Sequence, residues 1–251
     1  MIATISYKNK KLKVNLAKPL DISIPIDGTS SNVNAWYVVA PVITPHEVEG
    51  KQMSVAQGAA VNFNDISFNP HAHGTHTECA GHITEEVYAV NDYLNRYFFL
   101  AEVITIAPEK LGDDFIISKK QLQYALGKKK REAVVIRTIP NTTAKKNKQY
   151  SNTNPPFIME EAMQFLVDAG VDHLLIDLPS VDKEKDNGAL LAHNTFWNAK
   201  RNVKERLHAT ITEFIYVPNA IKDGTYLLNL QVAPFVNDAS PSRPVLYAVE
   251  D

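Results

Sequence analysis

Two segments that read as buried strands are joined through a helix, and this connection restricts the possible folds. Residues 133–138 (Ala-Val-Val-Ile-Arg-Thr) and 171–177 (Val-Asp-His-Leu-Leu-Ile-Asp) are mostly apolar runs of strand length. Between them, residues 159–169 have helical periodicity, and Gly170 stands where a C-terminal helix cap is expected. A strand, a helix and a second strand form a crossover unit, so at least part of the sheet is predicted to be parallel.

The rest of the chain predicts more strands than helices. Residues 2–16 suggest an N-terminal hairpin, and residues 118–127 suggest a helix that begins after Ser118 and ends at Gly127. No internal repeat or composition shift marks a linker, so we expect a single domain over residues 1–251. Further strands are predicted at residues 20–25, 36–40, 60–64, 97–106, 207–217, 225–232 and 245–249.

Composition excludes several classes of partner. The 251-residue chain is 45% apolar and 22% charged, as in ordinary globular proteins, and its formal net charge of −2 argues against nucleic acid as a partner. No run approaches the roughly 20 apolar residues of a membrane span, so no membrane partner is expected. The only cysteine is Cys79, and the N-terminus lacks the apolar core of a signal peptide, so we expect a cytoplasmic location.

Half of the eight histidines lie within twelve residues. One histidine on a strand is usually structural, but four beside a carboxylate favour a metal site or catalysis. Imidazoles and a carboxylate without a thiolate pair suit one or two Zn²⁺ or Mn²⁺ ions at an open, catalytic site. The group comprises His71, His73, His76, Glu78 and His82.

Alternation along a strand predicts how this group is arranged. If residues 75–79 are extended, His76 and Glu78 point to the same side. His82 follows Glu78 by four residues, so a turn or a first helical coil could fold it back beside the carboxylate.

The two earlier histidines have the opposite parity. A bulge at Gly74 would switch the register and bring His71 and His73 to the side of His76.

Two residues late in the chain are further candidates. Glu213 lies within the otherwise apolar-alternating segment 209–217, where an unpaired buried carboxylate would cost several kcal/mol. His193 follows a buried strand and an acidic loop. Trp36 and Phe196 are candidate apolar walls for an aromatic substrate, with core packing as the alternative for both.

These motifs resemble those of one enzyme family. Gly74-Thr75-His76-Thr77-Glu78 followed by His82 is similar to the His-x-Gly-Thr-His-x-Asp-x-Pro-x-His signature of the cyclase-like metal-dependent hydrolases, which include bacterial kynurenine formamidase and isatin hydrolase. Later segments match the family's order as well: Ile176-Asp-Leu-Pro-Ser-Val-Asp182 before His193, then Ala209-Thr-Ile-Thr-Glu213, then Tyr226-Leu-Leu-Asn-Leu-Gln231.

The resemblance implies a fold and a set of roles. The fold would be the swivelling β/β/α type of α/β domain, a mixed sheet with an additional antiparallel β layer and outer helices, and the protein would form a homo-oligomer. His76, Glu78, His193 and Glu213 match metal-ligand positions of the family. His82 matches a catalytic base or a second-site ligand.

Three positions depart from the family pattern. Glu78 replaces an aspartate, and Ala80 replaces a proline. The family's first histidine falls at Ala72, so either His71 or His73 must take over as a ligand. We favour His71, because its Asn-Pro context positions it rigidly, and keep His73 as the alternative.

We therefore predict a metal-dependent amidohydrolase in which a metal-activated water cleaves a C–N bond of a small amide, as in an arylformamidase. His82 would transfer the proton. The alternatives are a hydrolase of another cyclic amide, imide or lactone, and a metal- or ligand-binding relative without catalysis, which Ala72 keeps open.

Overall fold

The computed structural model describes residues 1–199 and 204–250, and most strands in them join one large mixed sheet. The sheet has 11 strands in this part of the chain, and β3 (Leu20–Asp21) pairs with β18 off the main path. The path runs through β1 (Ile2–Tyr7), β2 (Lys10–Asn15), β18 (Val245–Glu250), β16 (Gly224–Asn229), β9 (Phe98–Ile106), β12 (Ala133–Thr138), β14 (His173–Ile176), β15 (Thr210–Glu213), β8 (His76–Glu78) and β17 (Ala239–Pro241).

The centre of the sheet is parallel, which confirms the predicted crossover. Strands β9, β12, β14 and β15 run in the same direction, with Val135 of β12 opposite both Val103 and Leu175. All residues of β12 and β14 are buried, because both faces of these strands are covered. Antiparallel strands extend the sheet on each side: β16, β18 and the N-terminal hairpin on one, β8 and β17 on the other.

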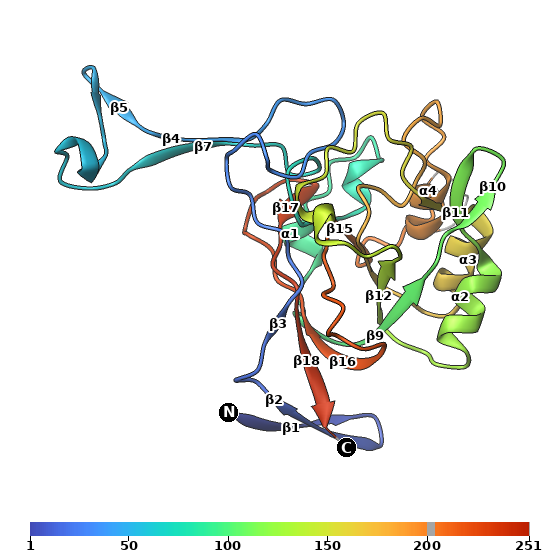
Figure 1. Ribbon diagram of the computed structural model, residues 1–251. Coiled ribbons are helices and arrows are strands. Elements are labelled where there is room, and N and C mark those ends of the chain that lie inside the picture. Colours follow the sequence, from blue (N-terminus) through green and yellow to red (C-terminus); the bar gives the residue numbers. More distant parts are fainter. Residues whose placement is uncertain (200–203, 251) are drawn as a thin grey trace.

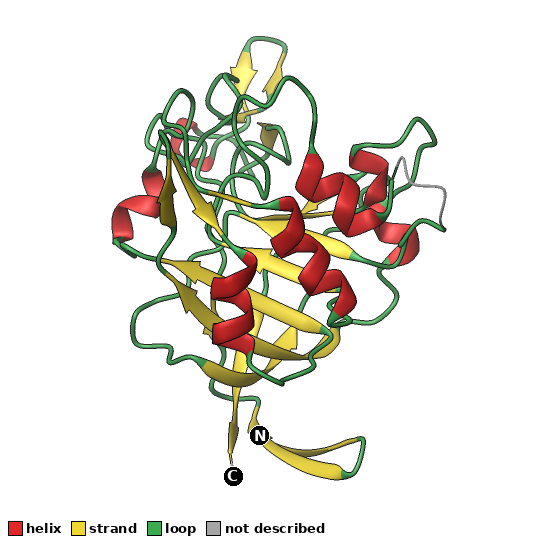
Figure 2. Ribbon diagram, turned by 90° about the vertical axis from the view of Figure 1, so that its right-hand side faces the viewer, coloured by secondary structure: helices red, strands yellow, loops and turns green. Residues whose placement is uncertain are grey.

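Three helices cover one face of the sheet (Figure 2). They are α2 (Lys119–Leu126), α3 (Glu160–Asp168) and α4 (Leu191–Trp197). The predicted start of α2 is confirmed, since Ser118 and Gln121 form a reciprocal capping box. Successive side chains of β12 alternate between two hydrophobic clusters, so the sheet is buried on both sides and the fold is mixed α/β.

Shorter elements complete the structure. A two-stranded arm of β4 (Val42–Pro45) and β7 (Asn64–Ser67) projects from the body and carries β5 (Glu47–Val48) and β6 (Lys51–Gln52) (Figure 1). A small sheet contains β10 (Glu109–Leu111), β11 (Asp114–Ile117) and β13 (Phe157–Ile158). The remaining helices are α1 (Val90–Tyr93) and the 3-10 helices at Val55–Gln57, Ala80–His82 and Thr143–Asn147.

Two predicted strands are wrong. Residues 36–40 form a turn, because Trp36 and Tyr37 both have φ of 60° and the Asn34 side chain donates to the Val38 carbonyl at 2.8 Å. The strand expected at 60–64 begins only at its last residue, Asn64, where pairing with β4 starts. Neither error moves the parallel core.

Among the described residues, none of the helices has the length and apolar character that a membrane span needs.

His173, at the start of β14, makes a pH-dependent contribution to stability. Its Nδ1 lies 2.9 Å from Thr210 Oγ1, and its ring packs on Phe99 with centroids 3.9 Å apart. Burial lowers the pKa of this imidazole to about 4, so the native state keeps it neutral at a pH where the unfolded chain takes up a proton.

We therefore predict that neutral His173 contributes on the order of 3 kcal/mol to the free energy of unfolding. This contribution is complete above about pH 6.5 and is lost as the pH falls to about 4. Urea unfolding of metal-free wild type and His173→Asn across this range measures it, and the difference between them should shrink with falling pH. A constant difference would contradict the prediction.

Candidate metal centre

Strand β8 presents the first two site residues. His76 and Glu78 are two residues apart, so both side chains leave the same face of the strand, and both are fully buried. Glu213 of β15 lies directly opposite His76 in the antiparallel pair, which brings a carboxylate from late in the chain to this face. The strand pairing thus assembles three of the predicted residues.

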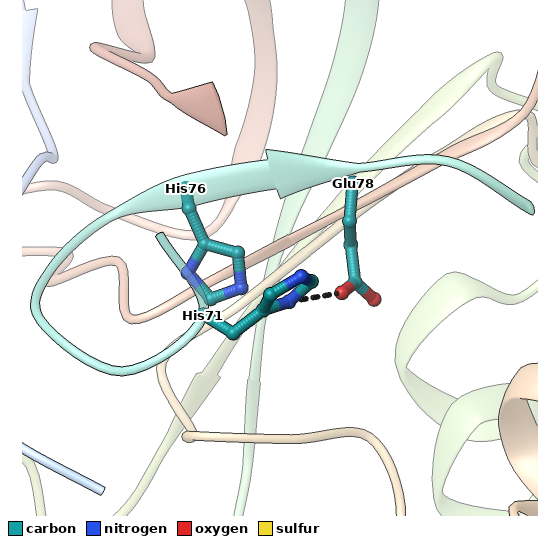
Figure 3. Close-up of side chains that lie close together, drawn as sticks. All are labelled: His71, His76 and Glu78. Carbon is teal, nitrogen blue, oxygen red and sulfur yellow. Dashed lines mark ion pairs between the residues drawn. The ribbon is translucent and has the colours of Figure 1, made fainter. Parts of the chain in front are cut away.

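The structure brings His71, and not His73, to this group. His71 Nδ1 lies 3.0 Å from Glu78 Oε2, and the dashed line in Figure 3 marks this ion pair. His73 uses both ring nitrogens elsewhere: Nδ1 accepts from the Asn69 N–H at 2.8 Å, and Nε2 donates to the Val39 carbonyl at 2.9 Å. A turn takes the place of the predicted Gly74 bulge, and of these two histidines only His71 contacts Glu78.

His82 reaches the cluster from the 3-10 helix directly after β8. Its ring stacks on His71 with centroids 4.2 Å apart, and its Nε2 lies 3.9 Å from Glu78 Oε2. Its side chain is 30% exposed, whereas His76 and His193 are almost completely buried. His82 is therefore open to a small molecule that enters the site.

His193 enters from the first turn of α4. Its Nδ1 lies 2.6 Å from Asp182 Oδ2, and its Nε2 lies 3.0 Å from Glu78 Oε1. Asp182 also accepts from the backbone N–H groups of Ala192 and His193. One carboxylate therefore pairs free N–H groups at the start of the helix and also orients the imidazole ring. With Nδ1 donating to Asp182, a neutral ring would offer its Nε2 lone pair to a cation bound beside Glu78.

Glu213 lies between the two buried histidines. Its Oε1 accepts from the Val181 N–H at 2.9 Å and is 3.8 Å from His193 Nε2. Its Oε2 is 3.6 Å from His76 Nε2. The carboxylate is thereby held in one orientation, with an oxygen near each imidazole.

The electrostatics of this cluster centre on two buried carboxyl groups. Burial alone would raise the pKa of Glu78, but His82, His193 and His71 outweigh it and hold this pKa well below its usual range. Burial together with the charge of Glu78 raises the pKa of Glu213. Two carboxylates this close need positive charge between them.

The histidines respond in the opposite sense. Burial alone would lower the pKa of His71, but Asp238 and Glu78 raise it to about 10. Burial would also lower the pKa of His193, and Asp182 and Glu78 raise it well above its ordinary value. The negative field of the site thus draws protons or another cation to these rings.

Two buried atoms that make ion pairs but no hydrogen bond indicate that the site fits a metal ion. His76 Nε2 and Glu78 Oε2 are buried and have no hydrogen-bond partner, although buried polar atoms are normally paired. Within the described residues, His71, His76 and Glu78 offer ligand atoms within 4.8 Å of one another, and so do Glu78, His82 and His193. Nitrogen and carboxylate donors of this kind suit a divalent transition metal.

Sequence reasoning assigned no role to two carboxylates here. Asp182 stands in the motif before His193, and its place in that motif is a signal that could have revealed it. Asp238 lies in a Val-Asn-Asp-Ala-Ser-Pro stretch that reads as an ordinary turn. Only the pairing of β17 with β8 brings its Oδ2 to 2.8 Å from His71 Nε2.

The two aromatic candidates differ in outcome. Trp36 is half-buried, and its indole N–H donates to the His71 carbonyl at 3.2 Å, which places it beside the cluster. Phe196 is fully buried in the core under the helices, with the Arg206 guanidinium 4.9 Å from its ring centroid. A ring enclosed in this way cannot contact a substrate, so its predicted binding role is corrected to core packing.

Comparison with known proteins shows the family of the chain. The Cyclase family, described as "Putative cyclase", matches residues 20–183, and the chain belongs to this family. A curated kynurenine formamidase of Bacillus cytotoxicus is 26% identical over 229 residues, which cover 90% of this chain and 96% of that protein.

Solved structures share the fold. Isatin hydrolase A from Labrenzia aggregata superposes with a TM-score of 0.68 at 13% identity, covering 93% of this chain and 94% of that one. A predicted metal-dependent hydrolase from Bacillus stearothermophilus gives a TM-score of 0.62 at 17% identity, with 92% and 98% covered.

Gly81 sets the position of His82, and we predict that it tolerates no side chain. A Cβ at this position would lie 2.1 Å from the Tyr88 carbonyl oxygen, so Gly81→Ala must displace the turn. The cost of such overpacking is typically about 1–3 kcal/mol. We expect a lower melting temperature and weaker Zn²⁺ binding, measured by thermal denaturation and chelator competition.

Gly112→Ala is the control for metal binding, because its added Cβ meets nothing within 4 Å in a hairpin turn away from the site, while its φ of 60° means that this variant also loses some stability. It should bind Zn²⁺ like wild type. Unchanged Zn²⁺ binding and stability in Gly81→Ala would show that this turn does not define the site.

Proposed function

We propose that the protein is a metal-dependent hydrolase that cleaves a C–N bond of a small amide. The observation that carries this proposal is the convergence of imidazoles on buried Glu78, with His76 Nε2 and Glu78 Oε2 left without hydrogen-bond partners. One Glu78 oxygen lies near His71 and the other near His193, so this carboxylate is suited to serve two metal positions.

The proposed ligands divide between those positions. His71, His76 and Glu78 would hold one ion, while Glu78, His193 and Glu213 would hold a second. We propose Zn²⁺ or Mn²⁺, with one or two ions per chain, because both accept imidazole and carboxylate together. When bound, such an ion lowers the pKa of a coordinated water to about 7 and supplies the hydroxide that attacks a carbonyl.

His82 is the proposed proton carrier. Its Nδ1 lies 3.4 Å from Asp238 Oδ2, while its Nε2 faces Glu78. Because the ring is partly exposed, Nε2 is the atom placed to take a proton from the attacking water and return it to the departing nitrogen. Trp36, next to His71, would form an aromatic wall for the substrate.

The kynurenine formamidase relative supports an N-formyl aryl amide as the substrate class. Hydrolysis of another cyclic amide, imide or lactone is the second candidate, since a water attack at the same site would open such a ring. The glutamate at position 78 supports this second candidate. Its side chain is one methylene longer than the aspartate of the family signature, and this changes the geometry at the metal.

We also propose a homo-oligomer. The projecting arm exposes apolar side chains that include Phe63 and Ile66, which are 56% and 59% exposed. A two-stranded ribbon is marginally stable alone, and a second copy of the chain would cover these residues.

We propose a cytoplasmic location, because a single free thiol suits a reducing compartment. The thiol of Cys79 is buried, and burial raises its pKa to about 11.

Turnover and metal content, measured together, test the proposed function. We predict that wild type, purified without a histidine tag, holds one or two Zn or Mn per chain by mass spectrometry and hydrolyses N-formylkynurenine. His82→Ala should keep its metal and fold but lose about 10²–10⁴-fold in kcat. His208→Ala, an exposed histidine outside the site, should match wild type.

Each alternative has its own outcome. Activity on isatin or a lactone without formamidase activity would select the second candidate. Equal ligand binding with no turnover in either wild type or His82→Ala would indicate a non-catalytic relative. A wild type that refuses both added Zn²⁺ and added Mn²⁺ would refute the metal-dependent function.

A further inference from the structure

Asp238 lies at the edge of the metal cluster, but neither the motif nor the proposed ligand set includes it. Its loop immediately precedes β17, whose Ala239 pairs with Glu78, and its backbone carbonyl accepts from the Cys79 N–H at 3.0 Å. The residue is therefore fixed beside the end of β8. Its side chain, 26% exposed, turns toward two histidine rings.

The first of these rings is His71, which occupies the site in the absence of a histidine at 72. Ala72 is fully buried and has no side chain that could bind a metal. His71, one position earlier in the backbone, reaches Glu78 instead. Its two ring nitrogens face different carboxylates: Nδ1 lies 3.0 Å from Glu78 Oε2, and Nε2 lies 2.8 Å from Asp238 Oδ2.

This geometry selects one tautomer. An ionised carboxylate only accepts, so the hydrogen bond to Asp238 requires a proton on His71 Nε2. In a neutral, metal-binding ring the lone pair is then on Nδ1, the nitrogen that lies 3.0 Å from Glu78 Oε2, and His71, His76 and Glu78 form one donor group. Histidine ligands of metals commonly donate their other N–H to a carboxylate in this way.

The same carboxylate faces the second ring. His82 Nδ1 lies 3.4 Å from Asp238 Oδ2, and its ring stacks on His71 at an interplanar angle of 29°. A single carboxylate oxygen thus lies against both stacked rings, on the side away from Glu78. It can orient each of them while leaving His82 Nε2 free for the substrate side.

We propose, on the basis of the metal-dependent function proposed above, that Asp238 is the positioning residue for His71 and His82. It holds the proton on His71 Nε2, so that His71 binds the metal through Nδ1. It thereby allows a histidine at 71 to serve in place of one at 72.

Two variants of the full-length protein separate positioning from other roles. Asp238→Asn keeps an oxygen that accepts from His71 Nε2–H, whereas Asp238→Leu has similar size and no acceptor. Competition with a chromophoric chelator gives the Zn²⁺ dissociation constant of each. We expect about 10- to 100-fold weaker binding for Asp238→Leu and a change within a few-fold for Asp238→Asn.

The matched control is Asp113→Leu, an exposed aspartate in the β10–β11 turn, which should bind Zn²⁺ like wild type. Long-range ¹H–¹⁵N spectra of the Zn²⁺-loaded wild type give an independent readout. They should show the His71 proton on Nε2, and this measurement decides the matter even if Asp238→Leu does not fold.

Three results would overturn the assignment of Asp238 while leaving the metal-dependent function intact. They are wild-type Zn²⁺ affinity in a folded Asp238→Leu, a His71 proton on Nδ1, and an Asp238→Asn loss as large as that of Glu78→Gln, which would make Asp238 a direct ligand. A wild type that binds no Zn²⁺ would refute the proposed function itself.

Discussion

The burial of the Glu78 carboxylate is the constraint on which the site depends. An isolated charge with no exposed surface costs many kcal/mol, and the protein offsets this cost by directing His71, His82 and His193 toward one carboxylate. The histidines need their own acceptors in turn, which Asp182 and Asp238 supply. A divalent cation among these groups would neutralise the same field that raises the pKa of His71 and His193.

The sheet topology explains how residues so distant in sequence meet at Glu78. Strand β8 lies between β15, which brings Glu213, and β17, whose preceding loop brings Asp238. His193 comes from a helix whose N-terminus is held by Asp182, in the loop that follows β14. Strands β12 and β14 of the parallel core are buried along their whole length, so the neighbouring strands at this end of the sheet can hold polar groups within hydrogen-bonding distance of one another.

Local pattern was enough to predict the crossover, the start of α2 and the same-side placement of His76 and Glu78. It failed at residues 36–40, where an apolar run suggested a strand but tertiary contacts hold two residues at positive φ. Phe196 was misassigned because an aromatic residue near His193 looks alike whether it faces a substrate or the core. Asp238 could not be found, because its role exists only after β17 pairs with β8, some 160 residues earlier in the chain. Local signals thus predicted elements and donors, while their mutual orientation required the fold.

The position of a bound metal ion is the most direct test of the proposed site. Anomalous diffraction from crystals of the Zn²⁺-loaded protein, collected on both sides of the zinc edge, would locate each ion relative to Glu78. We expect an anomalous peak bonded to His71 Nδ1, His76 Nε2 and Glu78, with any second peak next to His193 and Glu213. A zinc ion bound through His73, or one that does not contact Glu78, would contradict it.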